Sequence, residues 1–89
     1  MAKRNWDEFF ERVLDDSPQV EAKALEQAEQ RLLRNCLQRL EKPRRNPILL
    51  AFYRGLSHEQ IASRLSTPLG TIKGRIRAGL RALQECLQA

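Results

Sequence analysis

The chain of 89 residues is long enough for one small domain with a modest hydrophobic core. It contains no apolar run long enough to span a membrane and no signal peptide, so we expect a cytoplasmic protein. Its net charge of +5 is uneven: residues 1–41 carry −2 and residues 42–89 carry +7, which indicates nucleic acid as the partner of the basic half.

Residues 1–17 are predicted to form an N-terminal segment with a short amphipathic helix. The helix begins after Asn5, and its apolar positions are three and four residues apart at Trp6, Phe9, Phe10, Val13 and Leu14. A helix of about three turns is too short to be stable alone. Two interpretations remain open, namely that it packs on the core or that it docks on a partner.

Residues 18–89 are predicted to form an all-α domain. A long helix is expected from Ser17-Pro18 to about Glu41, with an apolar stripe at Leu25, Ala28, Leu32, Cys36 and Leu40, widened by Leu33 and Leu37. Residues 42–47 are predicted to be a basic loop bracketed by two prolines. Asn46 then caps a helix that begins at Pro47 and ends at Gly55, a C-cap glycine.

The strongest pattern is a helix-turn-helix between Ser57 and Leu87. Ser57 and Gln60 form a capping box, which begins a short helix. The sequence Ser66-Thr67-Pro68 breaks that helix, and Thr67 is predicted to cap a second helix that begins at Pro68. The apolar positions of the second helix are Leu69, Ile72, Ile76, Leu80, Leu83 and Leu87.

The polar face of this second helix has small residues at its centre and basic residues around them. Thr71, Gly74 and Ala78 lie opposite the apolar stripe, and the flanking basic residues are Lys73, Arg75, Arg77 and Arg81. Such a face can approach a polyanion closely, and the major groove of DNA admits a helix of this kind. A glycine in mid-helix costs roughly 1 kcal/mol relative to alanine, which Gly74 would recover through close backbone approach. A solvated basic face is the simpler alternative.

The remaining side chains indicate no catalytic, metal or cofactor site. Cys36 and Cys86 lie on or beside apolar helical stripes, so we expect buried thiols rather than a disulfide or a metal site. His58 is the single histidine, which leaves no zinc-binding set. We find no paired carboxylates, nucleophile–base pair or glycine-rich phosphate loop in a plausible setting, so we predict that the protein is not an enzyme.

Two blocks resemble region four of bacterial sigma factors of the extracytoplasmic-function type. Residues 55–62 read GLSHEQIA and residues 68–76 read PLGTIKGRI, where the family pattern is GLSxxEIA followed by PxGTVKSR. Here Gln60 replaces the usual glutamate and Gly74 the usual serine. The similarity extends from about Arg31 to Leu87, and it is most specific in the second block.

The resemblance implies a four-helix domain whose last helix enters the major groove of the promoter −35 element. It also implies binding to the flap of RNA polymerase and, often, to an anti-sigma factor. The predicted DNA-binding residues, partly carried over from the family by position, are His58, Glu59, Thr67, Gly70, Thr71, Lys73, Gly74, Arg75, Arg77 and Arg81. Sigma factors of this type also carry a promoter-melting domain, so both a fragment and a stand-alone region-four protein remain open.

Two rival functions share parts of this pattern. A LuxR-type regulator has the same GLSxxEIA start, but its recognition helix usually reads TVKxH, whereas residues 71–75 read TIKGR after Pro68. A protein-interaction module would use the same fold to bind polymerase or an anti-sigma factor without DNA, and the acidic N-terminal segment suits it.

Overall fold

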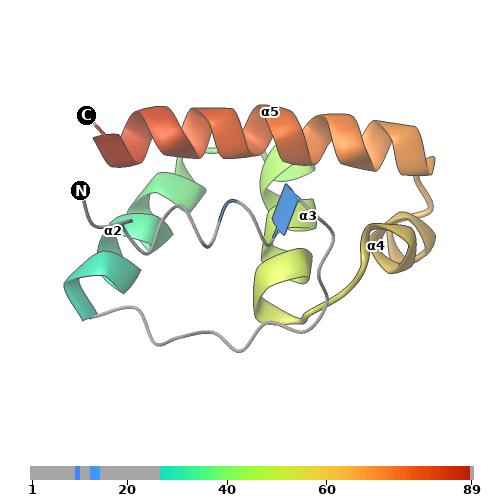
Figure 1. Ribbon diagram of the computed structural model, residues 1–89, viewed down its shortest axis with the longest axis horizontal. Helices are drawn as coiled ribbons and strands as arrows, with labels where there is room; N and C mark the ends of the chain where they lie inside the picture. The colour runs from blue at the N-terminus through green and yellow to red at the C-terminus, as the bar shows by residue number, and fades with distance from the viewer. Residues whose placement is uncertain (1–9, 11–12, 15–26, 89) are drawn as a thin grey trace.

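The computed structural model describes residues 10, 13–14 and 27–88, and this part of the chain is all-α. Its helices are α2 (Gln27–Gln38), α3 (Lys42–Tyr53), α4 (His58–Arg64) and α5 (Leu69–Gln88). The last of them, α5, extends along one side of the molecule. In Figure 1, α2, α3 and α4 lie beneath its C-terminal, middle and N-terminal parts in that order. None of these four helices is both long and apolar enough to cross a bilayer.

The core is organised along α5, which contacts all three of the other helices. Five of its six predicted apolar positions are buried, and Leu69 at its start is half-buried. These five side chains pack against buried residues of α2, α3 and α4, so the predicted stripe is confirmed. The buried positions of α5 are Ile72, Ile76, Leu80, Leu83 and Leu87.

The predicted stripe of the long N-terminal helix is partly wrong. The structure describes this helix from Gln27, and it ends at Gln38 rather than near Glu41. Its buried residues are Leu33, Cys36 and Leu37, whereas Leu32 is 42% exposed. The face turned towards α5 is therefore the one centred on Leu33. The predicted start near residues 17–18, and with it the proposed domain boundary, lies outside the described residues.

The predicted basic loop at residues 42–47 is wrong, because these residues form the first half of α3. Glu41 is the N-cap, and its carbonyl oxygen accepts from the backbone N–H groups of Arg44 and Arg45. Pro43 lies in the first turn, where a proline removes no helical hydrogen bond. Pro47 lies inside the helix rather than at its start. Its side chain is fully buried, and the free energy gained by this burial offsets part of the free energy lost with the missing helical hydrogen bond.

The end of α3 agrees better with the sequence. Helix α3 ends at Tyr53, Arg54 is the C-cap and Gly55 has a φ of 64°. A residue in the left-handed region just beyond the C-cap is a common helix stop, and glycine adopts it without a steric penalty. The backbone N–H of Leu56 donates to the carbonyl of Leu50, which turns the chain towards α4.

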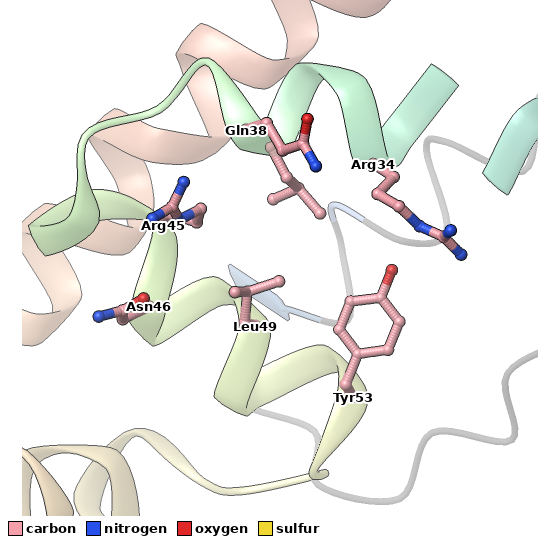
Figure 2. Close-up of a pocket in the computed structure, with 7 residues that line it drawn as sticks. Arg34, Gln38, Arg45, Asn46, Leu49 and Tyr53 are labelled. Carbon is pink, nitrogen blue, oxygen red and sulfur yellow. The ribbon is translucent and has the colours of Figure 1, made fainter. Parts of the chain in front are cut away.

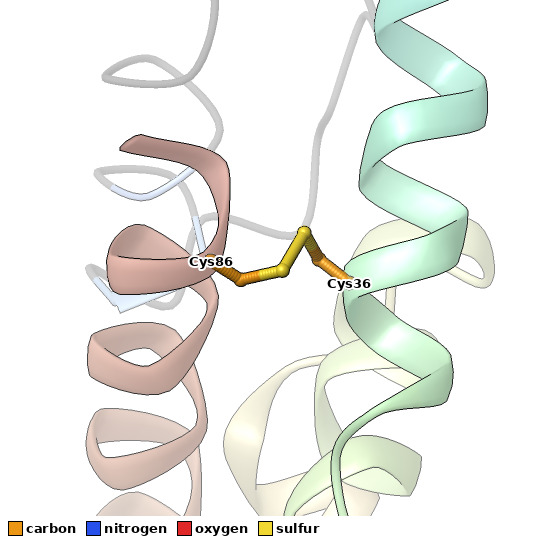
Figure 3. The surroundings of a disulfide bond; sticks show 2 residues. All are labelled: Cys36 and Cys86. Atoms are coloured by element: carbon orange, nitrogen blue, oxygen red, sulfur yellow. A yellow bond between two sulfur atoms is a disulfide. The ribbon is translucent and has the colours of Figure 1, made fainter. Parts of the chain in front are cut away.

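The prediction of two buried thiols is wrong, since Cys36 and Cys86 form a disulfide with their Cα atoms 5.9 Å apart. Figure 3 shows the bond joining α2 to α5. Both cysteines lie on the apolar stripes of their helices, and these stripes face each other. The separation of 50 residues in sequence gave no sign of the pairing, because only the packing of α2 on α5 brings the sulfur atoms together.

Three residues of the predicted N-terminal helix are described, namely Phe10, Val13 and Leu14, and all three are helical. Val13 is buried in the core, Phe10 packs against it and Leu14 is exposed. For these residues the structure favours packing on the core over an undocked segment. The other residues of that helix lie outside the described part of the chain.

Candidate nucleic-acid interface

The first helix of the motif begins with the predicted capping box. The Ser57 hydroxyl accepts from the backbone N–H of Gln60, and the Gln60 side chain accepts from the backbone N–H of Ser57. These two hydrogen bonds satisfy N–H groups that the first turn of a helix otherwise leaves unpaired. The start of α4 is therefore fixed by local sequence.

A tight turn joins α4 to α5 and sets the angle between them. Ser66 has a φ of 50°, in the left-handed region. The N–H of Thr67 donates to the carbonyl of Ala62, and that of Ser66 donates to the carbonyl of Ser63. This pair of hydrogen bonds is the Schellman arrangement that closes many helices. The Thr67 hydroxyl donates to the carbonyl of Leu65 (3.0 Å), and α5 begins at Leu69, so the predicted capping of a helix at Pro68 by Thr67 is not observed.

The polar face of α5 is turned to solvent, as its sequence pattern predicts. Thr71, Lys73 and Gly74 are exposed in its first half, and Arg77 and Arg81 are exposed further along. Lys73, Arg77 and Arg81 recur every fourth residue, which places them in one row on the helix. Gly70 at the start of the helix is also exposed, while Arg75 and Ala78 are half-buried.

The two glycines of this face differ from the third glycine of α5. A Cβ atom built at Gly70 or Gly74 meets no other atom within 4 Å, so packing within the described residues does not explain either glycine. At Gly79 the same Cβ would lie 2.6 Å from Cδ1 of Ile48 and 3.1 Å from the carbonyl oxygen of Arg44. Gly79 therefore lets α5 approach α3 closely, a role that was not predicted from the sequence. Its position on the apolar side of the helix was the available signal.

The structure places His58 and Glu59 differently, although the family pattern treats both as DNA contacts. Glu59 is exposed in the first turn of α4. His58 is only 3% exposed, and its Nε2–H donates to the carbonyl oxygen of Val13 (2.7 Å). This burial and hydrogen bond favour a structural role for His58 over the predicted base contact. The burial arises because Val13 packs into the core beside the start of α4.

A concave surface lies between α2 and α3, apart from the polar face of α5. It has a volume of about 480 Å³, and its lining residues are Arg34, Leu37, Gln38, Arg45, Asn46, Leu49 and Tyr53. Figure 2 shows the Arg34 and Tyr53 side chains on one side of this cavity, Arg45 and Asn46 on the other, and Leu49 between them. Tyr53 is 57% exposed. The surface thus combines apolar contact area with two guanidinium groups, and none of the lining residues in the described part of the chain is acidic.

Within the described residues, no three histidine, cysteine, aspartate or glutamate side chains form a group that would hold a metal ion. The polar side chains in the first half of α5 are basic and hydroxyl groups. These groups suit the binding of phosphate oxygens and base edges.

The comparisons with known proteins agree with this arrangement. Residues 30–83 match the family model described as "Sigma-70, region 4". The chain is 48% identical over 59 residues to the ECF RNA polymerase sigma factor SigK of Mycolicibacterium vanbaalenii, which covers 66% of this chain and 30% of that protein. It is 44% identical over 61 residues to the SigK protein of Mycobacterium ulcerans, which covers 68% of this chain and 33% of that protein.

The SigK protein of Mycobacterium tuberculosis strain H37Ra is 42% identical over 59 residues, or 66% of this chain and 32% of its own length. The matched region thus spans about a third of the length of these curated relatives. The family model covers α3, α4, most of α2 and the first three quarters of α5, which include the capping box and the basic row. Sequence and fold together place the chain in the sigma-70 region 4 family.

Proposed function

We propose that this protein binds double-stranded promoter DNA at the −35 element, as the region-four part of a sigma factor that directs RNA polymerase. One observation carries the proposal. Thr71, Lys73 and Gly74 are exposed together on the half of α5 nearest the turn, opposite the buried stripe. A helix with a slim polar face and basic flanks fits the major groove, which is about 12 Å wide. The partners are found in the bacterial cytoplasm, and we propose the same location for this chain.

The residues of this face divide into two proposed roles. Arg77 and Arg81 neutralise phosphates and fix the register of the helix, aided by the unpaired N–H groups of its first turn near Gly70. Thr71 and Lys73 read base edges, and each good base contact contributes about 1–3 kcal/mol of discrimination. Binding makes and breaks no covalent bond, so no catalytic group is needed.

Three further predicted residues have smaller proposed roles. Glu59 is exposed at the start of α4 and is proposed to contact DNA beside that helix. Arg75 is half-buried, so we propose that it supports the motif and reaches the backbone with its guanidinium group only. Thr67 lies in the turn, where its N–H and its hydroxyl already donate to protein carbonyls, so we propose that it positions the start of α5 against DNA without contacting a phosphate itself.

The first experiment is selection of duplexes from a random pool, followed by titration of the selected duplex. Lys73→Ala should weaken binding to that duplex much more than Arg64→Ala, its matched control, which removes an exposed cation from α4. The logarithm of the binding constant should fall with the logarithm of salt concentration by about 0.9 per phosphate neutralised. Equal losses for the two variants, or an affinity that is indifferent to salt, would refute groove binding by α5.

A second candidate function is binding to RNA polymerase without DNA, and the surface between α2 and α3 favours it. This surface combines the exposed Tyr53 and the half-buried Leu49 with the cations Arg34 and Arg45, which suits a protein partner with acidic and apolar side chains. We propose that it contacts the flap of the polymerase and that an anti-sigma factor competes for the same surface. Tyr53→Ser should reduce capture of polymerase core enzyme, and Lys73→Ala should not. The reverse result would assign polymerase binding to α5.

A further inference from the structure

Residues from the start of the chain contact both helices of the helix-turn-helix. His58 is the first residue of α4, and its Nε2–H donates to the carbonyl of Val13, 45 residues earlier in sequence. Both residues are almost fully buried, at 3% and 2% exposed. A buried hydrogen bond of this kind is costly to leave unmade. Val13 is therefore attached to α4 by both packing and a hydrogen bond.

The neighbours of Val13 extend the same contact to α5. Phe10 and Leu14 line a groove of about 290 Å³ together with Arg77, Leu80, Arg81 and Gln84 of α5. The described N-terminal residues are drawn in blue beneath α5 in Figure 1. Two of the three cations in the basic row therefore border an apolar wall that comes from outside the motif. The third, Lys73, does not line this groove.

An apolar wall beside an arginine affects how that arginine binds a phosphate. The methylene stem of an arginine covers apolar surface while its guanidinium group stays in water. Stems held in this way lose fewer rotamers when the guanidinium groups engage DNA. Ordering a rotamer-rich side chain on binding costs about two- to tenfold in affinity, and preorganisation removes part of that cost.

We propose that Phe10, Val13 and Leu14 form a brace, held in place by His58, that preorganises Arg77 and Arg81 for DNA phosphates. His58 is then a positioning residue and not a DNA contact. The proposal rests on the DNA-binding function proposed above. It assigns the N-terminal residues to the DNA-binding unit, in addition to the helix-turn-helix itself.

The test uses two exposed leucines as a matched pair. Leu14 is 45% exposed and lines the groove, whereas Leu32 of α2 is 42% exposed and lies elsewhere. Leu14→Ser should weaken binding to the selected duplex about two- to tenfold, and Leu32→Ser should leave it unchanged. Neither change removes a buried side chain, so both variants should fold, which circular dichroism checks. Equal affinities for the two variants would overturn the proposal.

A double-mutant cycle tests whether the brace acts through the arginines. In the background Arg77→Ala with Arg81→Ala, Leu14→Ser should cause no further loss of affinity. Additive losses would show that Leu14 acts by another route and would overturn the proposal. In the same assay Lys73→Ala must weaken binding. If it does not, the proposed DNA-binding function itself fails, independently of the brace.

The role of His58 is tested by conservative rescue. His58→Gln keeps a side-chain N–H that can reach the Val13 carbonyl, whereas His58→Leu keeps the bulk and removes the donor. His58→Gln should retain more DNA affinity than His58→Leu. Both variants keep Lys73 on the exposed face of α5, so any difference in affinity comes from the change at position 58. Equal DNA affinities for the two variants would show that the His58 hydrogen bond does not hold the brace in place. If His58→Leu fails to fold, the comparison of Leu14→Ser with Leu32→Ser decides the proposal.

Discussion

Gly74 offers the sharpest test of close approach between α5 and DNA, because alanine there should raise stability and lower affinity at once. The glycine is exposed in mid-helix, and a Cβ at this position meets no atom within 4 Å. Gly74→Ala should therefore gain the helix propensity of alanine, about 1 kcal/mol. For a domain of this size that gain raises the thermal midpoint by about 4–8 °C. Thermal and urea denaturation of the DNA-free protein measure it.

The same substitution should weaken binding to the selected duplex. If the backbone at Gly74 lies against the groove, an added methyl group overpacks the contact. Overpacking of a well-packed site costs about 1–3 kcal/mol, which is about fivefold or more in affinity. A variant that is more stable and binds DNA as tightly as the parent protein would refute the close approach.

Gly79→Ala is the matched control on the buried side of the same helix. Its Cβ would crowd Cδ1 of Ile48, which is fully buried and has little room to move, and the Arg44 carbonyl. An overpacking cost of about 1–3 kcal/mol exceeds or cancels the propensity gain of about 1 kcal/mol. We expect this variant to be no more stable than the parent protein. If Gly79→Ala gains as much stability as Gly74→Ala, the α3–α5 contact accommodates the added methyl group without a loss of free energy.

Three other predictions concern stability alone. The Cys36–Cys86 disulfide links residues 50 apart in sequence, and its reduction should lower the free energy of unfolding by about 2–4 kcal/mol. Urea denaturation with and without reductant measures this loss. A chain with both cysteines replaced by serine should not respond to reductant. Ser66→Gly should stabilise the protein by about 1 kcal/mol, since Ser66 has a left-handed φ of 50° that favours glycine. An unchanged thermal midpoint would show that the backbone at Ser66 is not strained. Ser57→Ala should lower the free energy of unfolding by about 0.5–2 kcal/mol through loss of the cap, whereas Ser63→Ala within α4 should change it little.

The helix-turn-helix could be predicted closely because its signals are local. The capping box at Ser57 and Gln60 uses residues three apart, and the structure shows both of its hydrogen bonds. The apolar stripe of α5 persists over many turns, so a shift of one residue at its start did not change which face is buried. The exposure of Thr71 and Gly74 follows from that stripe directly, since they lie on the opposite side of the helix.

The larger errors involve contacts between distant parts of the chain, whereas the cap that is absent at Thr67 and the early end of α2 are local errors. Two prolines four residues apart suggested a loop, but Pro43 fits the first turn of α3 and Pro47 is buried among other elements. His58 is at a position that contacts DNA in the family pattern, yet the carbonyl of Val13 satisfies it inside the protein. The disulfide likewise depends on how α2 packs on α5. Local sequence does not contain these contacts, because burial of a residue depends on which other element covers it.

The closeness of α5 to α3 at Gly79 has a consequence for how promoter preference can change. Gly79 and Thr71 are eight residues apart on the same helix, a distance of about 12 Å along the helix axis. A rotation of α5 by about 5° about its contact with α3 at Gly79 would displace Thr71 by about 1 Å. Such a displacement would disturb the alignment of a base contact. If α5 binds DNA as proposed, substitutions at the fully buried Ile48 should therefore change which duplexes the protein prefers.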